Sequence, residues 1–167
     1  KLNSRRTILT GLAFLSICAF WQMYDSVIPL ILTKTFHMNE TFSGAIMAAD
    51  NVLALFLLPF FGARSDKTNT KIGKRMPYIL FGTGCAVILM NLLPLMDNSY
   101  AAAPSGFKTA SFVIVLGLLL IAMGTYRSAA VALMPDLTPK PLRSRANAII
   151  NLMGAVGGIL YLAVAAI

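Results

Sequence analysis

Long runs of apolar residues, separated by short polar gaps, dominate the pattern of this chain. Five of these runs are long enough to cross the hydrocarbon core of a bilayer, which takes about 20 residues of α-helix. In lipid every backbone N–H and C=O group must be paired within the segment, so runs of this length predict helices. We expect the helices at about residues 8–33, 42–61, 77–95, 111–134 and 146–167.

The composition favours a membrane protein over a soluble domain. Of the 167 residues, 57% are hydrophobic and only 12% are charged, whereas soluble domains carry about 25% charged residues. A net charge of +8 could suit nucleic acid, but the charges lie in gaps between apolar runs, so we expect no nucleic-acid partner. Cys18 and Cys85 both lie inside apolar runs, which is typical of core residues and not of a disulfide or metal site.

Lysine and arginine are distributed unevenly between the gaps. If every run spans the membrane, the N-terminal tail, the second gap and the fourth gap lie on one side, and the positive-inside rule makes that side cytoplasmic. We therefore expect an integral, multi-pass protein of a bacterial cell inner membrane, with its N-terminus in the cytoplasm. Eleven of the 14 basic residues lie on that side: Lys1, Arg5, Arg6, Arg64, Lys67, Lys71, Lys74, Arg75, Lys140, Arg143 and Arg145.

The second gap carries a specific order of residues, "GARSDKTNTKIGKRMPYI", from Gly62 to Ile79. Charge bias alone does not require this order. It resembles the signature loop of the major facilitator superfamily, and its "SDK" followed by "GKRMPYI" looks most like the sucrose-carrier and glycoside–pentoside–hexuronide branches. The fourth gap and its flanks, "ALMPDLTPKPLRSRANAIINLMGAVGG", are similar to the loop between helices 4 and 5 of the same branches.

The resemblance implies an all-α membrane protein, in which residues 1–167 form about five transmembrane helices of an N-terminal six-helix bundle and stop within the fifth. A full member has about twelve helices in two similar halves, so the C-terminal half would be a partner. The implied function is secondary active transport, with proton-coupled uptake of a sugar or glycoside by alternating access. An exporter of drugs or metabolites, or an inactive fragment, are the alternatives. One histidine and no Cys/His group argue against an enzyme or a cofactor.

In the family, residues of the signature loop form an inner latch between the two halves. We expect this role for Asp66 and Arg75; Asp66 could bond to a nearby arginine or cap a helix N-terminus. Three lysines of the same loop have a simpler interpretation as topology signals and lipid contacts: Lys67, Lys71 and Lys74. The predicted gating residues are Gly62, Asp66, Gly73, Arg75, Asp136 and Arg145.

Three ionisable side chains lie inside apolar runs, where they are costly and usually functional. Asp25 and Asp50 lie roughly 13 Å from the outer ends of their runs, and Arg127 roughly 12 Å from the cytoplasmic end of its own. Secondary transporters bind substrate near this depth. Two acids against one base leave one acid for a proton, so we expect Asp25, ahead of Asp50, to couple transport to protons. The alternatives are a structural Asp25–Arg127 pair and a helix–helix hydrogen bond for Asp50.

Polar and aromatic side chains surround these charges on the predicted helices. Gln22 shares a face of the first run with Asp25, and Trp21 and Tyr24 lie beside it. Amides and carboxylates bind hydroxyl groups, and an aromatic ring can stack on the apolar face of a sugar. Packing roles for Trp21 and Tyr24, and a counter-ion role for Arg127, are the other interpretations. The predicted substrate-binding residues are Gln22, Trp21, Tyr24, Asn51 and Arg127.

Overall fold

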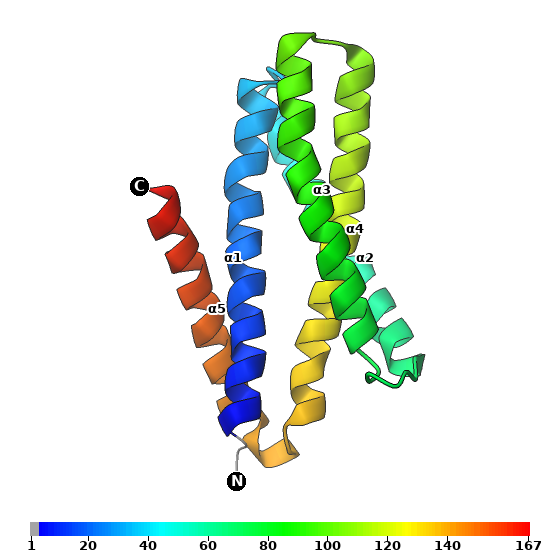
Figure 1. Cartoon of the computed structure of the whole chain (residues 1–167), viewed down its shortest axis with the longest axis vertical. Helices are drawn as coiled ribbons and strands as arrows, with labels where there is room; N and C mark the ends of the chain where they lie inside the picture. Colours follow the sequence, from blue (N-terminus) through cyan, green and yellow to red (C-terminus); the bar gives the residue numbers. More distant parts are fainter. Residues whose placement is uncertain (1–3) are drawn as a thin grey trace. The chain divides into compact units, whose positions relative to one another are not determined.

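Helices form the architecture of the computed structural model, which describes residues 4–167, with side chains from Thr7 onward except those of Asp50 and Met134. The helices are α1 (Ser4–Lys34), α2 (Glu40–Lys67), α3 (Met76–Ala102), α4 (Gly106–Leu137), the short 3-10 helix η1 (Lys140–Leu142) and α5 (Arg143–Ala165) (Figure 1). Each long helix coincides with one apolar run and is long and apolar enough to cross a membrane. The predicted all-α membrane fold is confirmed.

The helices extend beyond the apolar runs that predicted them. α2, predicted to end near Phe61, continues to Lys67, and α3 continues past Leu95 to Ala102. A helix with the 28 residues of α2 is about 42 Å long, whereas the hydrocarbon core is about 30 Å thick. The additional turns therefore reach the polar interface, and Asp66, expected in the connecting loop, lies in the last turn of α2.

The chain divides into two compact units. The first contains the chain up to Val27 together with Ala130–Ile167, and the second contains Ile28–Ala129. Two of the helices, α1 and α4, contribute residues to both units. The predicted site residues are therefore best described unit by unit.

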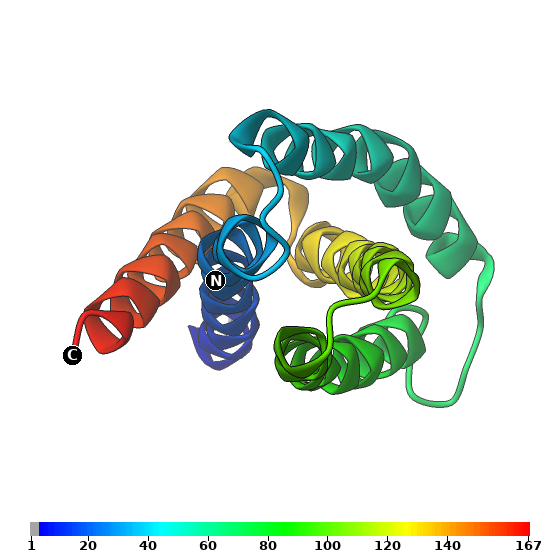
Figure 2. The ribbon, with the colours of Figure 1, turned by 90° about the horizontal axis from the view of Figure 1, so that it is seen from above.

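In the first unit, α1 and α5 lie side by side and run in the same direction (Figure 1, Figure 2). Gly11 lies against Met153 and Leu15 lies against Gly157, so the contact advances along both helices together. A Cβ atom at Gly157 would lie 2.9 Å from the carbonyl carbon of Leu15, which means that the two backbones touch. Small residues permit such close packing between membrane helices.

In the second unit, α3 packs closely on α4. A Cβ atom at Gly82 would lie 2.8 Å from the backbone nitrogen of Tyr126. Where α1 ends, the ring of Phe36 stacks on Tyr100 with ring centroids 4.2 Å apart, and lies 4.5 Å from Phe112. The largest buried apolar side chains of this unit come from three helices: Ile28, Leu32, Leu93, Phe112, Leu116, Leu119 and Met123.

Candidate functional site

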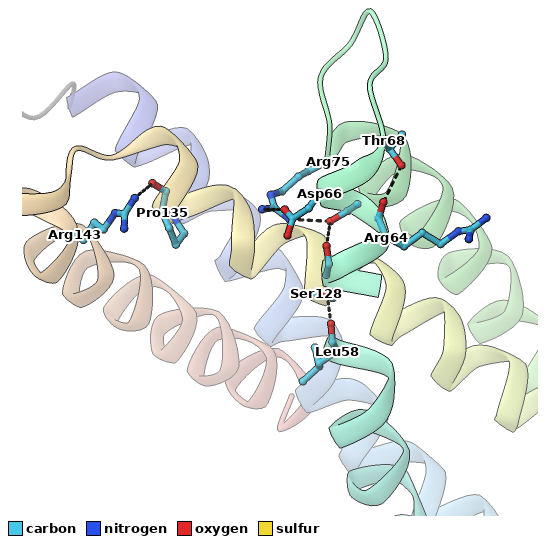
Figure 3. Close-up of polar contacts among 10 residues, drawn as sticks. Leu58, Arg64, Asp66, Thr68, Arg75, Ser128, Pro135 and Arg143 are labelled. Carbon is cyan, nitrogen blue, oxygen red and sulfur yellow. Dashed lines mark hydrogen bonds and ion pairs between the residues drawn. The ribbon is translucent and has the colours of Figure 1, made fainter. Parts of the chain in front are cut away.

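An ion pair closes the loop between α2 and α3. The Nη2 group of Arg75, just before α3, donates a hydrogen bond of 2.6 Å to Oδ1 of Asp66 (Figure 3). Only 8% of the Arg75 side chain is exposed, whereas 60% of the Asp66 side chain is exposed. Burial of a guanidinium group costs several kcal/mol of hydration free energy, and a hydrogen-bonded counter-charge is needed to offset this cost. The predicted salt bridge of Asp66 is confirmed; the alternative, a helix N-terminal cap, is wrong because Asp66 lies at a helix C-terminus.

A buried serine connects this ion pair to α2. Ser65 is fully buried, and its Oγ accepts a hydrogen bond of 2.8 Å from Nη1 of Arg75. The same hydroxyl donates to the backbone oxygen of Gly62 at 2.8 Å. Arg75 is therefore held by an acid and a hydroxyl one residue apart in sequence, both on the last turns of α2.

The rest of the loop is also closed by side-chain bonds. Thr68 Oγ1 bonds to the backbone oxygen of Arg64 at 3.0 Å (Figure 3) and to the hydroxyl of Tyr78, on α3, at 2.9 Å. Thr70 Oγ1 donates to the backbone oxygen of Gly73 at 2.6 Å. Gly73 has a φ of 111°, a conformation that a side chain would oppose. The loop is a folded element, and Gly73 supplies the backbone conformation that its turn requires.

A second serine anchors α4 to α2 below the loop. Ser128 Oγ donates a hydrogen bond of 2.7 Å to the backbone oxygen of Leu58 (Figure 3). A Cβ atom at Gly62 would lie 3.4 Å from the same Oγ, so Gly62 gives room for this approach. Interhelical hydrogen bonds of this kind stabilise packing in a membrane. Ser128 is not among the predicted site residues.

The connection between α4 and α5 carries the remaining predicted gating residues. Asp136 lies in the last turn of α4 and Arg145 in the first turns of α5, and both are exposed. Arg143 donates to the backbone oxygen of Pro135 at 3.1 Å (Figure 3) and to that of Thr138 at 3.4 Å. A cation therefore lies at the last carbonyl groups of α4, where the helix dipole favours positive charge.

The predicted substrate residues of α1 lie in the first unit. The rings of Trp21 and Tyr24 are in contact, with centroids 5.8 Å apart and planes at 76°. Tyr24 is fully buried, which is compatible with the packing role that was the alternative interpretation, and its role in substrate binding stays a prediction. Gln22 is half-buried, and its Oε1 lies 3.8 Å from the position of a Cβ atom at Gly158. Asp25 follows on the exposed side of the helix and has an interaction partner in the chain.

The other predicted residues belong to the second unit. Asn51 is exposed on α2, and its Nδ2 donates to the backbone oxygen of Met47 at 3.2 Å. Arg127 is half-buried on α4 and also has an interaction partner. Asp50 lies within α2, but its side chain is outside the described part of the molecule.

Five helices of the described residues are long and apolar enough to cross a membrane, which defines the class as a multi-pass integral membrane protein. The family model described as Major Facilitator Superfamily matches residues 10–167. The chain belongs to this superfamily, as its loop residues predicted. Membership places the chain in a family of transport proteins.

Several curated relatives are sucrose transport proteins. Sucrose transport protein SUC3 of Arabidopsis thaliana is 33% identical over 139 residues, which cover 76% of this chain and 23% of that protein. Sucrose transport protein SUT3 of Oryza sativa subsp. japonica is 28% identical over 170 residues, which cover 91% of this chain and 33% of that protein. A protein of Escherichia coli (strain K12) with the name "Putative transporter YdfJ", which names no solute, is 34% identical over 95 residues, which cover 54% of this chain and 21% of that protein.

The chain thus spans only 23% to 33% of the length of these two sucrose transport proteins. No solved structure matches it.

Proposed function

We propose that this chain is the N-terminal bundle of a secondary active transporter that takes up a sugar or glycoside together with a proton. The observation that carries the proposal is an amide beside aromatic rings in an apolar helix: Gln22 lies next to Trp21, whose ring contacts Tyr24. An amide offers both donors and an acceptor to sugar hydroxyls, and a large aromatic surface suits the apolar face of a sugar ring. Relatives named as sucrose transport proteins support the same solute class.

Proton coupling is assigned to Asp25, with Asp50 as the second candidate. Asp25 lies on α1 three residues after Gln22, so one helical turn separates a titratable group from a proposed sugar ligand. An acid within a membrane span is costly and is usually retained for function. Asn51 and Arg127 keep the substrate-contact role that the sequence predicts.

The loop between α2 and α3 is proposed to act as a gate. Alternating access requires one helical bundle to rock against another, so the bundle needs a surface that is rigid and charged. The ion pair between Arg75 and Asp66 supplies both properties, because the buried cation is fixed and the acid remains exposed. Gly62, Gly73, Asp136 and Arg145 complete the proposed gating set, on the side of the membrane that the basic residues assign to the cytoplasm.

Transport by the full-length parent protein tests the proposal. Purified protein in proteoliposomes is offered sucrose, other disaccharides and pentosides, with and without an inward proton gradient. We expect accumulation of at least one sugar that requires the gradient and disappears with a protonophore or in protein-free vesicles. Failure to transport any sugar, together with gradient-driven expulsion of unrelated solutes, would replace the proposal with the exporter alternative.

A further inference from the structure

The exposed surface of α5 has two faces of different chemistry. A buried stripe that includes Gly154 and Gly157 packs on α1. Exposed apolar side chains suited to lipid form one remaining face: Ile149, Leu152, Val156, Ile159 and Leu160. The other remaining face carries Asn147 and Asn151, four residues apart and both exposed, and continues to Gly158.

These two asparagines differ from Asn51 on α2 and Asn91 on α3. On α2 and α3 the amide nitrogen donates to the carbonyl group one turn earlier: Asn51 to Met47 at 3.2 Å and Asn91 to Val87 at 2.8 Å. The side chains of Asn147 and Asn151 make no hydrogen bond within the described part of the chain. Their amide groups are therefore open to an external partner.

The depth of Asn151 makes such a partner necessary. It lies eight residues after the start of α5 at Arg143, about 12 Å along the helix. An unsatisfied amide group in hydrocarbon costs several kcal/mol. The face that bears Asn151 therefore needs water, a polar ligand or another polar protein group beside it, whereas the face that bears Leu152 can meet lipid.

The asparagine face continues to the proposed sugar ligand on α1. From Asn151 to Gly158 is seven residues, about 10 Å along α5, and Gly158 lies beside the Oε1 of Gln22. Between them the exposed residue on this face is small, Ala155. The asparagine face thus has an amide near each end and only a small side chain between them.

We infer that Asn151, supported by Asn147, lines the solute path and contacts sugar hydroxyl groups as a specificity-determining residue. The inference rests on the proposed function, because it takes its ligand class from there. An amide both donates and accepts, so Asn151 can bind a hydroxyl group in either direction, and together with Gln22 it favours a solute longer than one sugar ring.

The test uses the full-length parent protein with Cys18 and Cys85 replaced by alanine and a single new cysteine, from Asn151→Cys or, as the matched control, Leu152→Cys. A charged, membrane-impermeant methanethiosulfonate reagent is applied to proteoliposomes with and without sucrose. We expect reaction at position 151, slowed by sucrose, and no reaction at position 152. An unreactive thiol at 151, or a reaction that sucrose leaves unchanged in a protein that transports sucrose, overturns the inference.

Kinetics separate this inference from the proposed function. Loss of one hydrogen bond to the sugar in Asn151→Ala is expected to raise KM for sucrose about tenfold, while Leu152→Ala leaves KM unchanged. An unchanged KM in Asn151→Ala overturns the inference alone. A parent protein that transports no sugar overturns the proposed function instead, and that result is obtained before any variant is compared.

Discussion

One buried arginine organises the residues at the end of α2. Arg75 withdraws its guanidinium group from water, which is unfavourable unless the group finds hydrogen bonds and an opposite charge. Asp66 and Ser65 meet both needs, at 2.6 Å and 2.8 Å. Lysine could not replace this arginine without loss, because a single ammonium group does not present two donors in a fixed fork.

Replacing Asp66 by asparagine removes the counter-charge and retains the side-chain shape. We expect Asp66→Asn in the full-length parent to lower the initial rate of uptake several-fold, because the buried cation of Arg75 loses its partner and the proposed gate loses its fixed geometry. The amount of protein inserted in the membrane should stay close to wild type. The rate is measured in proteoliposomes at equal protein content.

Lys71→Gln is the matched control, since Lys71 is exposed in the same loop. It should retain wild-type uptake. Equal rates in Asp66→Asn and Lys71→Gln would mean that the ion pair has no part in transport.

The sequence suggested an ion pair between Asp66 and a nearby arginine, with a helix cap as the alternative, but it did not indicate the two serines. A single acid in a basic loop is expected to pair with one of several cations, and only the structure shows that the partner is Arg75. A hydroxyl in a helix can instead satisfy itself on its own backbone, as Thr125 does on Ile121 at 2.7 Å. Only the packing of α4 against α2 shows that Ser128 bonds to Leu58.

At the scale of the helices, apolar runs predicted where each element lies but not where it ends. Hydropathy reports the hydrocarbon core, and a helix can continue into the interface without apolar residues. In α2 the last turn carries Arg64 and Lys67, cations that favour a helix C-terminus through the dipole. The extension to Lys67 places Asp66 in a helix and so fixes its direction toward Arg75.

The close contact between α3 and α4 depends on glycine at position 82. A methyl group there would lie 2.8 Å from the backbone nitrogen of Tyr126 and 3.1 Å from the backbone oxygen of Ala122. We expect Gly82→Ala to destabilise the protein by about 1–3 kcal/mol, because the two backbones must separate. Thermal unfolding of the full-length protein in detergent measures the change.

Gly84, two residues along the same helix, provides the control. A Cβ atom at Gly84 would meet nothing within 4 Å, and alanine favours helix over glycine by up to about 1 kcal/mol. Gly84→Ala should therefore unfold at the wild-type temperature or slightly above it. A Gly82→Ala protein as stable as Gly84→Ala would contradict the contact.

For the whole molecule, the distribution of basic residues predicts opposite sides for neighbouring loops. The loop after α2 contains Lys71 and Lys74, whereas the turn between α3 and α4 contains Ala103, Pro104 and Ser105. A cysteine introduced as Asn69→Cys should react with an impermeant maleimide only from the cytoplasmic side, and one introduced as Ser105→Cys only from the outside. Labelling of intact cells and of inverted vesicles distinguishes them; labelling of both sites from one side would overturn the topology.

The sequence could not assign every exposed helix face to lipid, solute or protein. Asn147 and Asn151 are short polar residues in a run that is otherwise apolar, and hydropathy averages them with their neighbours. Their significance follows from the buried stripe of α5 on α1, which fixes where the remaining faces point. The faces of a predicted helix can be assigned to lipid, solute or protein only when the helix that packs against it is known.

Coupling is a property of the whole transporter, and Asp25 is the residue predicted to confer it. Asparagine at position 25 cannot bind and release a proton, so uptake against a concentration gradient should fail in Asp25→Asn of the full-length parent. Exchange of labelled for unlabelled sugar needs no net proton movement and should persist, which separates coupling from binding. Asp25→Glu restores the titratable group and should recover at least part of the driven uptake. If Asp25→Asn still accumulates sugar in response to a proton gradient, Asp50 becomes the candidate; if Asp50→Asn does so as well, neither acid alone carries the proton.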